Sequence, residues 1–178
     1  MVEDTLFKGS RFFLDSILTI IDGAIAEERE LPFCNAKKVD FSFALVAHRF
    51  VFTIGGRNLV GKNGNEALHD VRSIYTQDHS IHAGWKEMSS LQVGRVNASA
   101  CYTNGKLFVF GGYVLNEGNL SSLEVLDLAN SLDHHPKWEQ IEVDQAVFAP
   151  RKNPVVAPAS DTTLVIFLGT QSAVTSFT

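Results

Sequence analysis

The sequence predicts an all-β fold built from a repeated unit of 56 to 58 residues. Its main landmark is a run of four apolar residues closed by two glycines, in residues 106–113, KLFVFGGY. Residues 50–56, FVFTIGG, repeat it, and residues 164–170, LVIFLGT, are a third version with Thr170 at the place of the second glycine. The first glycines lie 56 and 58 residues apart, at Gly55, Gly111 and Gly169. A period of roughly 40 to 60 residues with strand patterns is typical of β-propeller blades.

Each apolar run is interpreted as a strand covered on both faces, because apolar residues follow one another without alternation. The glycines explain its abrupt end, since a residue without a Cβ adopts positive φ and lets a neighbouring backbone come close. Two further landmarks keep nearly the same step: Trp85 and Trp138 are 53 residues apart, and Arg95 and Arg151 are 56 apart. A tryptophan at one fixed place in each unit favours packing between blades over ligand stacking.

The composition is that of a globular protein, with 45% hydrophobic and 20% charged residues. A net charge of −5 gives no basic surface for nucleic acid or an anionic membrane. Cys34 and Cys101 form no metal or disulfide framework, which fits a reducing compartment, so we expect a cytoplasmic location. The apolar residues 12–21 are read as mature protein, because acidic residues precede them and Asp15 interrupts them.

Each unit is expected to contain four antiparallel strands. First strands are predicted at residues 41–46 and 96–102, each followed by a glycine-ended second strand. Asn104-Gly105 lies between two such strands and is a strong hairpin signal, because both residues tolerate positive φ. Third strands are expected at residues 71–75 and 123–126, and fourth strands begin near Trp85 and Trp138.

The two ends of the chain are expected to hold parts of blades. Residues 14–22, LDSILTIID, resemble residues 119–127 and predict a third strand, with a fourth strand at residues 27–30. Residues 154–169 give a first and a second strand. The predicted division is a partial blade at 1–38 (third and fourth strands), two whole blades at 39–95 and 96–151, and the start of a partial blade at 152–178. About three blades make an open arc, since a closed ring needs about four to eight.

The order of these features resembles the Kelch repeat: an apolar run with a double glycine, a variable loop, a short strand, a tryptophan and then an arginine. The resemblance covers about residues 38–169. The chain departs from the pattern in the missing tryptophan before Pro32, in Thr170, and in Thr76, where an aspartate often ends the third strand. The resemblance implies a non-catalytic protein-interaction module with no cofactor. It leaves open a carbohydrate-active enzyme, because sugar oxidases and sialic acid epimerases occur on Kelch-like propellers.

One face of the predicted blades carries both the second-to-third loops and the links between blades. Proteins that resemble this one generally hold protein partners on that face, and self-association or membership of a larger propeller is also open. The expected partner-contacting residues are Arg57, Asn58, Lys62, Arg95, Tyr113, Asn116, Glu117 and Arg151.

Two rival readings concern ligands. Residues 56–63, GRNLVGKN, fit the phosphate-binding pattern G-x-x-x-x-G-K-[ST] except for Asn63, and the glycine that follows argues against the helix such a loop needs. Its counterpart at residues 112–119 has no lysine, so we expect no nucleotide site. The histidine pairs 79/82 and 134/135 have no cysteine or carboxylate at a ligand spacing and predict no metal site.

Overall fold

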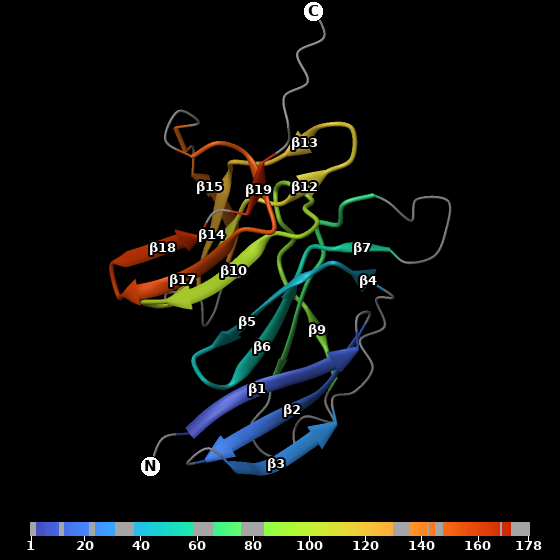
Figure 1. Cartoon of the computed structure of the whole chain (residues 1–178), viewed down its shortest axis with the longest axis vertical. Coiled ribbons are helices and arrows are strands. Elements are labelled where there is room, and N and C mark those ends of the chain that lie inside the picture. Colours follow the sequence, from blue (N-terminus) through green and yellow to red (C-terminus); the bar gives the residue numbers. More distant parts are fainter. Residues whose placement is uncertain are drawn as a thin grey trace, which may run out of the picture.

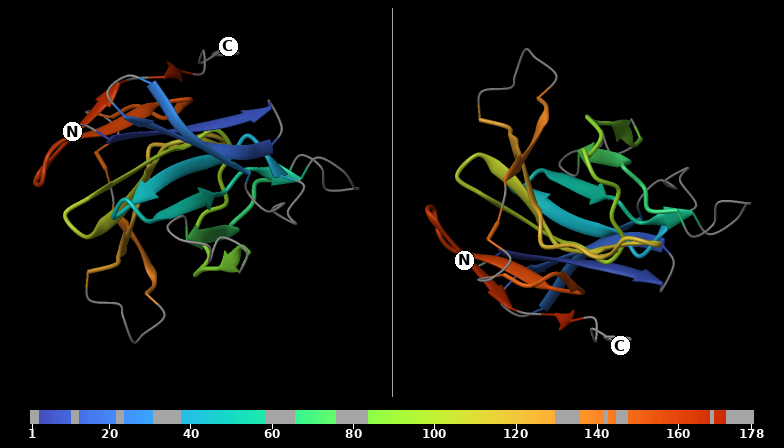
Figure 2. Two further views of the ribbon diagram at one scale, coloured as in Figure 1. Left: turned by 90° about the horizontal axis from the view of Figure 1, so that it is seen from below. Right: turned by 90° about the horizontal axis from the view of Figure 1, so that it is seen from above.

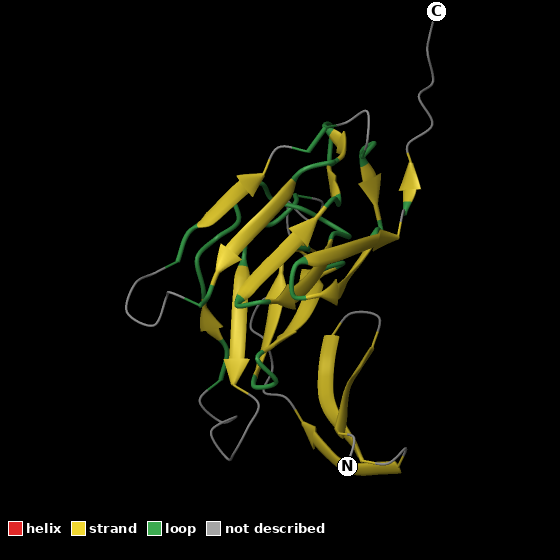
Figure 3. Ribbon diagram, turned by 90° about the vertical axis from the view of Figure 1, so that its left-hand side faces the viewer, coloured by secondary structure: helices red, strands yellow, loops and turns green. Residues whose placement is uncertain are grey.

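The computed structural model describes residues 3–10, 13–21, 24–30, 38–58, 66–75, 84–129, 136–141, 143–144, 148–167 and 169–171. All regular elements in these residues are β-strands (Figure 3). A three-stranded sheet, two four-stranded sheets and a two-stranded hairpin follow one another along the chain and form an open arc rather than a closed ring (Figure 1). The predicted all-β fold made of antiparallel four-stranded blades in an open arc is therefore confirmed. No helix in these residues has the length and apolar character needed to cross a membrane.

The first complete sheet is antiparallel and has the order β5-β6-β8-β9. Its strands are β5 (Ser42–Val46), β6 (Phe50–Ile54), β8 (Val71–Tyr75) and β9 (Lys86–Glu87). Each begins within one residue of its predicted position. A tight turn joins β5 and β6, with positive φ at Ala47 and His48 (50° and 55°).

The second complete sheet repeats this arrangement in the order β10-β11-β14-β15. Its strands are β10 (Ser99–Thr103), β11 (Lys106–Phe110), β14 (Leu123–Asp127) and β15 (Trp138–Ile141). The hairpin predicted at Asn104-Gly105 is confirmed: both residues have positive φ, 46° and 73°, and Thr103 pairs with Lys106. The first strand of the second sheet begins three residues later than predicted, because residues 96–98 pair with or bond to segments outside their own sheet.

A three-stranded antiparallel sheet precedes the complete sheets, with β1 (Glu3–Ser10), β2 (Phe13–Ile21) and β3 (Ala24–Glu30). The strands β2 and β3 lie where a third and a fourth strand were predicted. The sequence did not predict β1, which pairs with β2 along its whole length. The other end of the arc is the hairpin of β17 (Val155–Ser160) and β18 (Thr163–Phe167).

Short strand pairs flank the complete sheets. They are β4 (Lys38–Val39) with β7 (Arg57–Asn58), β12 (Tyr113–Val114) with β13 (Gly118–Asn119), and β16 (Arg151–Lys152) with β19 (Thr170–Gln171). The first strands β5, β10 and β17 are neighbours, with β10 in the middle, so successive sheets stack side by side (Figure 2). A hydrogen bond from Asn97 N to Asp40 O recurs one unit later from Asn153 N to Asn97 O, both at 2.9 Å.

The main core lies between the two complete sheets. Trp138 begins β15, is 3% exposed, and donates its indole N–H to the carbonyl oxygen of Ser89 at 2.8 Å. The predicted packing of this tryptophan between blades is confirmed. The buried residues of this core are Ala44, Val46, Phe52, Ile54, Val71, Leu91, Leu107, Val109, Leu126 and Trp138. Val51 and Phe110, on the other face of β6 and β11, are buried as well, which explains why these two second strands read as unbroken apolar runs.

The prediction for the third glycine run, at residues 164–170, needs a correction. A Cβ added to Gly169 would meet the carbonyl oxygen of Lys152, just as one on Gly112 would meet that of Val96. Lys152 also pairs with Thr170, in the same way that Val96 forms a bridge to the residue after Gly112. Gly169 therefore corresponds to the second glycine of the run. The prediction that Thr170 replaces the second glycine is wrong, and the first position falls outside the described residues.

Candidate interaction site

The candidate interaction site is the edge of the arc at which β6 and β11 end. The strands β7, β12 and β13 follow directly at this edge, and we call the surface they form the loop face (Figure 1). Both glycine pairs stand just before it, at the turn from the buried strand into the loop. A Cβ on Gly111, which has φ 66°, would lie 2.9 Å from the carbonyl oxygen of Arg151. The glycines therefore let the link to the following blade cross close to the strand end.

Several predicted contact residues lie on the loop face. Arg57 donates from Nε to a carboxylate oxygen of Asp40 at 2.7 Å, and both side chains are about one-third exposed (35% and 34%). Asn58 is half-buried and pairs through its backbone with Lys38. Asp40 therefore orients the guanidinium of Arg57.

The β12–β13 hairpin is the most exposed part of the loop face. Asn116 and Glu117 are exposed at its tip, and Asn116 has φ 72°. Leu115, which the sequence reasoning did not single out, is 44% exposed beside them. Tyr113 is half-buried, and Lys152 Nζ lies 5.9 Å from the centre of its ring. An exposed leucine next to polar residues gave no signal in the sequence because it interrupts no pattern. Lys62 and the rest of the phosphate-loop pattern from residue 59 to residue 63 lie outside the described residues.

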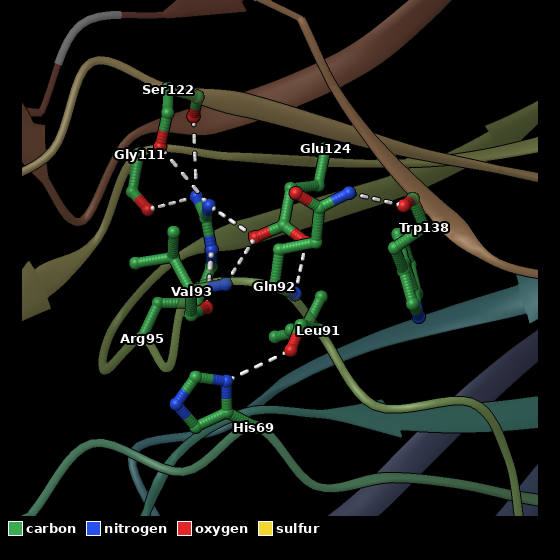
Figure 4. Close-up of polar contacts among 9 residues, drawn as sticks. All are labelled: His69, Leu91, Gln92, Val93, Arg95, Gly111, Ser122, Glu124 and Trp138. Atoms are coloured by element: carbon green, nitrogen blue, oxygen red, sulfur yellow. Dashed lines mark hydrogen bonds and ion pairs between the residues drawn. The ribbon is translucent and has the colours of Figure 1, made fainter.

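Arg95 must be removed from the predicted contact surface because its side chain is fully buried (0% exposed). Its guanidinium donates hydrogen bonds to the carbonyl oxygens of Gly111 and Ser122 at 2.8 and 3.2 Å. It also binds the Ser122 hydroxyl at 3.1 Å and the Glu124 carboxylate at 2.6 Å (Figure 4). Burial lowers the pKa of Arg95 from its usual value, and the Glu124 carboxylate opposes this shift. Arg95 therefore joins one blade to the next.

Glu124 completes this junction, and the sequence reasoning missed it. Its carboxylate accepts hydrogen bonds from the backbone N–H groups of Gln92 and Val93 at 2.7 and 3.1 Å, in addition to Arg95 (Figure 4). The link between the sheets is held further by His69 Nδ1, which donates to the Leu91 carbonyl oxygen at 2.8 Å. The available signal was a carboxylate inside an otherwise apolar third strand, LEVL, which is costly unless it is paired.

The first blade has a related junction at the matching position. Lys38 is 2% exposed, and its ammonium group binds the Asp70 carboxylate at 2.7 Å. Lys38 and Arg95 stand 57 residues apart, and each binds an acidic residue at or near the start of the third strand that follows. Asp70 also accepts a hydrogen bond from Arg72 Nε at 3.2 Å. A buried cation paired with a carboxylate at or just before the third strand is thus a repeated feature of the link between blades.

Arg151 occupies the next matching position. Its backbone N–H donates to Leu120 O at 2.9 Å and its carbonyl accepts from Gly112 N at 2.9 Å, as Arg95 bonds to Leu68 and Gly56 one unit earlier. The side chain is half-buried, and its Nε is buried without a hydrogen-bond partner in the part of the chain that the structure describes. The structure thus places Arg151 at a blade link, next to the loop face.

No cluster of three or more histidine, cysteine, aspartate or glutamate residues that could hold a metal ion is found within the described ranges. The two histidine pairs singled out in the sequence lie outside those ranges. Cys101 is 6% exposed in β10, and burial raises the pKa of its thiol to about 11. A thiol with that pKa stays protonated near neutral pH, as expected for a small core residue.

The chain repeats a four-stranded antiparallel sheet, and the segment that links one sheet to the next forms hydrogen bonds and ion pairs with the next sheet. This arrangement is that of a repeat protein of the β-propeller type. A family model described as the Kelch motif matches residues 94–141, which contain Arg95, Glu124 and the whole second sheet. An F-box/kelch-repeat protein of Arabidopsis thaliana is 26% identical over 106 residues, which cover 57% of this chain and 26% of the relative. Over these residues the chain is therefore similar to Kelch-repeat proteins.

Proposed function

We propose that the chain is a non-catalytic protein-interaction module that holds a protein partner on its loop face. The observation that carries the proposal is the exposed tip of the β12–β13 hairpin, where Leu115 is 44% exposed beside the exposed polar residues Asn116 and Glu117. An exposed apolar side chain inside a polar rim has the composition of a protein-binding contact. The likeness to an F-box/kelch-repeat protein supports a protein partner rather than a small molecule.

The rigidity of the scaffold supports the same proposal. The loops begin at glycines that touch the link to the next blade, and that link is held by buried ion pairs such as Arg95 with Glu124. Loops that stand on a rigid frame lose less entropy when a partner binds. In this proposal Arg57, Asn58, Tyr113, Asn116 and Glu117 contact the partner, and Lys62, which lies outside the described residues, is a further proposed contact.

We also propose a cytoplasmic location, on the basis of the cysteine usage. The carbohydrate-active alternative would need a single-copy cluster of metal-binding or sugar-acid-binding side chains. Nothing in the described residues favours that alternative over protein binding.

The test is affinity capture with the intact chain and two matched charge reversals. Glu117→Lys changes an exposed acid at the tip of the loop face, whereas Asp161→Lys makes the same change in the exposed β17–β18 turn on the opposite face. We expect specific partners to be lost with Glu117→Lys, more completely with Leu115→Ser added, and retained with Asp161→Lys. Equal recovery of the same partners by both charge reversals would contradict the assignment of the loop face.

A further inference from the structure

The turn between β10 and β11 consists of an asparagine followed by a glycine. Asn104 is exposed, Gly105 is half-buried, and their φ angles are 46° and 73°. Positive φ at both residues of a two-residue loop defines a type I′ turn, in which ψ of the first residue is about +30°. Thr103 pairs with Lys106 across the turn, and Leu128 N donates a hydrogen bond of 2.8 Å to Gly105 O. The conformation at Asn104 is therefore held by both strands of the hairpin and by the segment after β14.

The fold does not depend on this dipeptide to form the turn. The matching turn of the first sheet, between β5 and β6, has Ala47 and His48 at the same two places, with φ 50° and 55°. A hydrogen bond of 3.0 Å from Arg49 N to Val46 O closes it. Asn-Gly is the preferred sequence for a type I′ turn, but the first sheet shows that other residues adopt it here. The chemistry of the asparagine can therefore be tested separately from the shape of the turn.

An asparagine that precedes a glycine can lose its side-chain amide without an enzyme. The backbone nitrogen of the glycine attacks Cγ of the asparagine and forms a C–N bond. The side-chain nitrogen leaves as ammonia and takes the proton of the attacking N–H group. Water then opens the five-membered succinimide at one of its two carbonyls, which gives aspartate or isoaspartate. Glycine favours the attack because it has no Cβ to block the approach.

The native turn keeps the two reacting atoms apart. The ring closes only when the Gly105 nitrogen lies on the same side of the Cα–C bond as the Asn104 side chain, and at the ψ of a type I′ turn it lies on the opposite side. The reactive geometry therefore requires the turn to open. The next pair along the hairpin is Tyr102 with Leu107, and both belong to the main core, with Leu107 fully buried (0% exposed). Opening exposes this core surface and is therefore rare in the native protein.

We propose that Asn104-Gly105 is a modification site under the control of the fold: it stays intact in the native chain and converts when the second sheet opens. The isoaspartate product then prevents the hairpin from re-forming. Its chain runs through the side-chain methylene, so the turn gains one backbone atom, and the pairing of a hairpin depends on the length of its turn. A Cβ on Gly105 would already lie 2.6 Å from Cβ of Ala129, so the lengthened turn has no room on that side. The site thus marks chains that have opened and keeps them open.

The experiment measures amide loss in the intact chain by peptide mapping with mass spectrometry at mildly alkaline pH. Trypsin cleavage after Arg95 and Lys106 isolates residues 96–106 from the other Asn-Gly of the sequence, Asn63-Gly64. The reference is the linear peptide of residues 102–109, YTNGKLFV, with blocked ends. In native buffer Asn104 should convert at least about tenfold more slowly than in the peptide, because opening must come first. In denaturing urea the two rates should be equal.

Two matched variants test whether opening of the second sheet sets the rate. Glu124→Gln removes the buried charge that pairs with Arg95, so it should speed the conversion of Asn104 in native buffer severalfold. Glu139→Gln makes the same change at an exposed position of β15 and should leave the rate within about twofold of the wild type. If Glu124→Gln does not fold, the wild type in urea below its unfolding transition provides the same comparison.

Returning converted chains to native buffer tests the effect of the product. Chains with isoaspartate at position 104, detected with isoaspartyl methyltransferase, should unfold at a lower urea concentration than unmodified chains. Asn104→Ala, which copies the residue of the first-sheet turn, should keep its own midpoint through the same treatment. Equal rates in the native chain and the peptide, or an unchanged rate with Glu124→Gln, would overturn the control by the fold. An unchanged midpoint of the isoaspartate chains would overturn the effect on the hairpin. None of these outcomes depends on the loop face, which Glu117→Lys probes separately.

Discussion

Replacing Glu124 by glutamine should be one of the most damaging single-atom changes in this protein. Both carboxylate oxygens are used: one accepts from Arg95 Nη2 at 2.6 Å and Val93 N at 3.1 Å, and the other from Gln92 N at 2.7 Å. Both partners of the ion pair are fully buried (0% exposed). Glutamine has nearly the same shape but removes the charge and turns one N–H donor toward donors that need an acceptor.

The expected cost follows from the buried charge that remains. Removing one partner of a buried ion pair costs about 3–5 kcal/mol, because the other charge stays in the interior uncompensated. For a chain of this size that corresponds to a fall in the melting temperature of roughly 6–20 °C. Urea unfolding followed by tryptophan fluorescence measures the free energy directly, and Trp138 lies close to the altered site, because Gln92 bonds both to Glu124 and to the carbonyl oxygen of Trp138.

Two further variants make this prediction sharp. Glu139→Gln is the same change at an exposed position of β15 and should alter the free energy of unfolding by less than about 0.5 kcal/mol. The double variant Arg95→Met with Glu124→Leu removes both charges and should be less destabilised than Glu124→Gln alone. A loss below about 1 kcal/mol for Glu124→Gln, with the fold retained, would refute the view that this pair joins the blades.

Three other predictions follow from individual sites. Gly111→Val should lower the free energy of unfolding by about 1–3 kcal/mol, since its Cβ would lie 2.9 Å from Arg151 O at φ 66°. Gly118 also has positive φ, but a Cβ there would meet open space, so Gly118→Val should lower it less. Equal losses would show that the close approach to Arg151 O does not contribute. The raised pKa of the buried Cys101 thiol, about 11 against an ordinary 9.0, stabilises the fold fully below about pH 9, and this contribution should be lost as the pH rises through about 11. Cys101→Ala should abolish that part of the pH dependence of the unfolding free energy, and a thiol that reacts rapidly with iodoacetamide at pH 8 in the folded protein would contradict the assignment. Lys62 should bind no nucleotide: a millimolar or tighter ATP affinity that Lys62→Ala abolishes, measured by calorimetry, would show that the phosphate-loop reading of residues 56–63 is right.

The candidate interaction site was predictable only in part. The exposed positions of Asn116 and Glu117 follow from a loop whose ends are fixed by a glycine pair and a third strand, both visible in the sequence. The function of Arg95 was misread, because an arginine after a tryptophan looks the same in sequence whether it faces solvent or the interior. Its partner Glu124 is 29 residues away and reaches it only when the second sheet packs on the link. The division into blades at residues 38, 95 and 151 stays a prediction.

The sequence by itself determined the features that depend on local chemistry. Asn104-Gly105 makes its turn because both residues accept positive φ, and the apolar runs of β6 and β11 become central strands whose faces are covered. The tertiary structure alone decided which glycine of the third run meets the following link, which cations are buried, and that β1 joins β2. These depend on strand pairing and on packing between sheets. In strand pairing and sheet packing, residues far apart in the chain come into contact. A shift of one residue in the pairing of two strands changes which side chains touch.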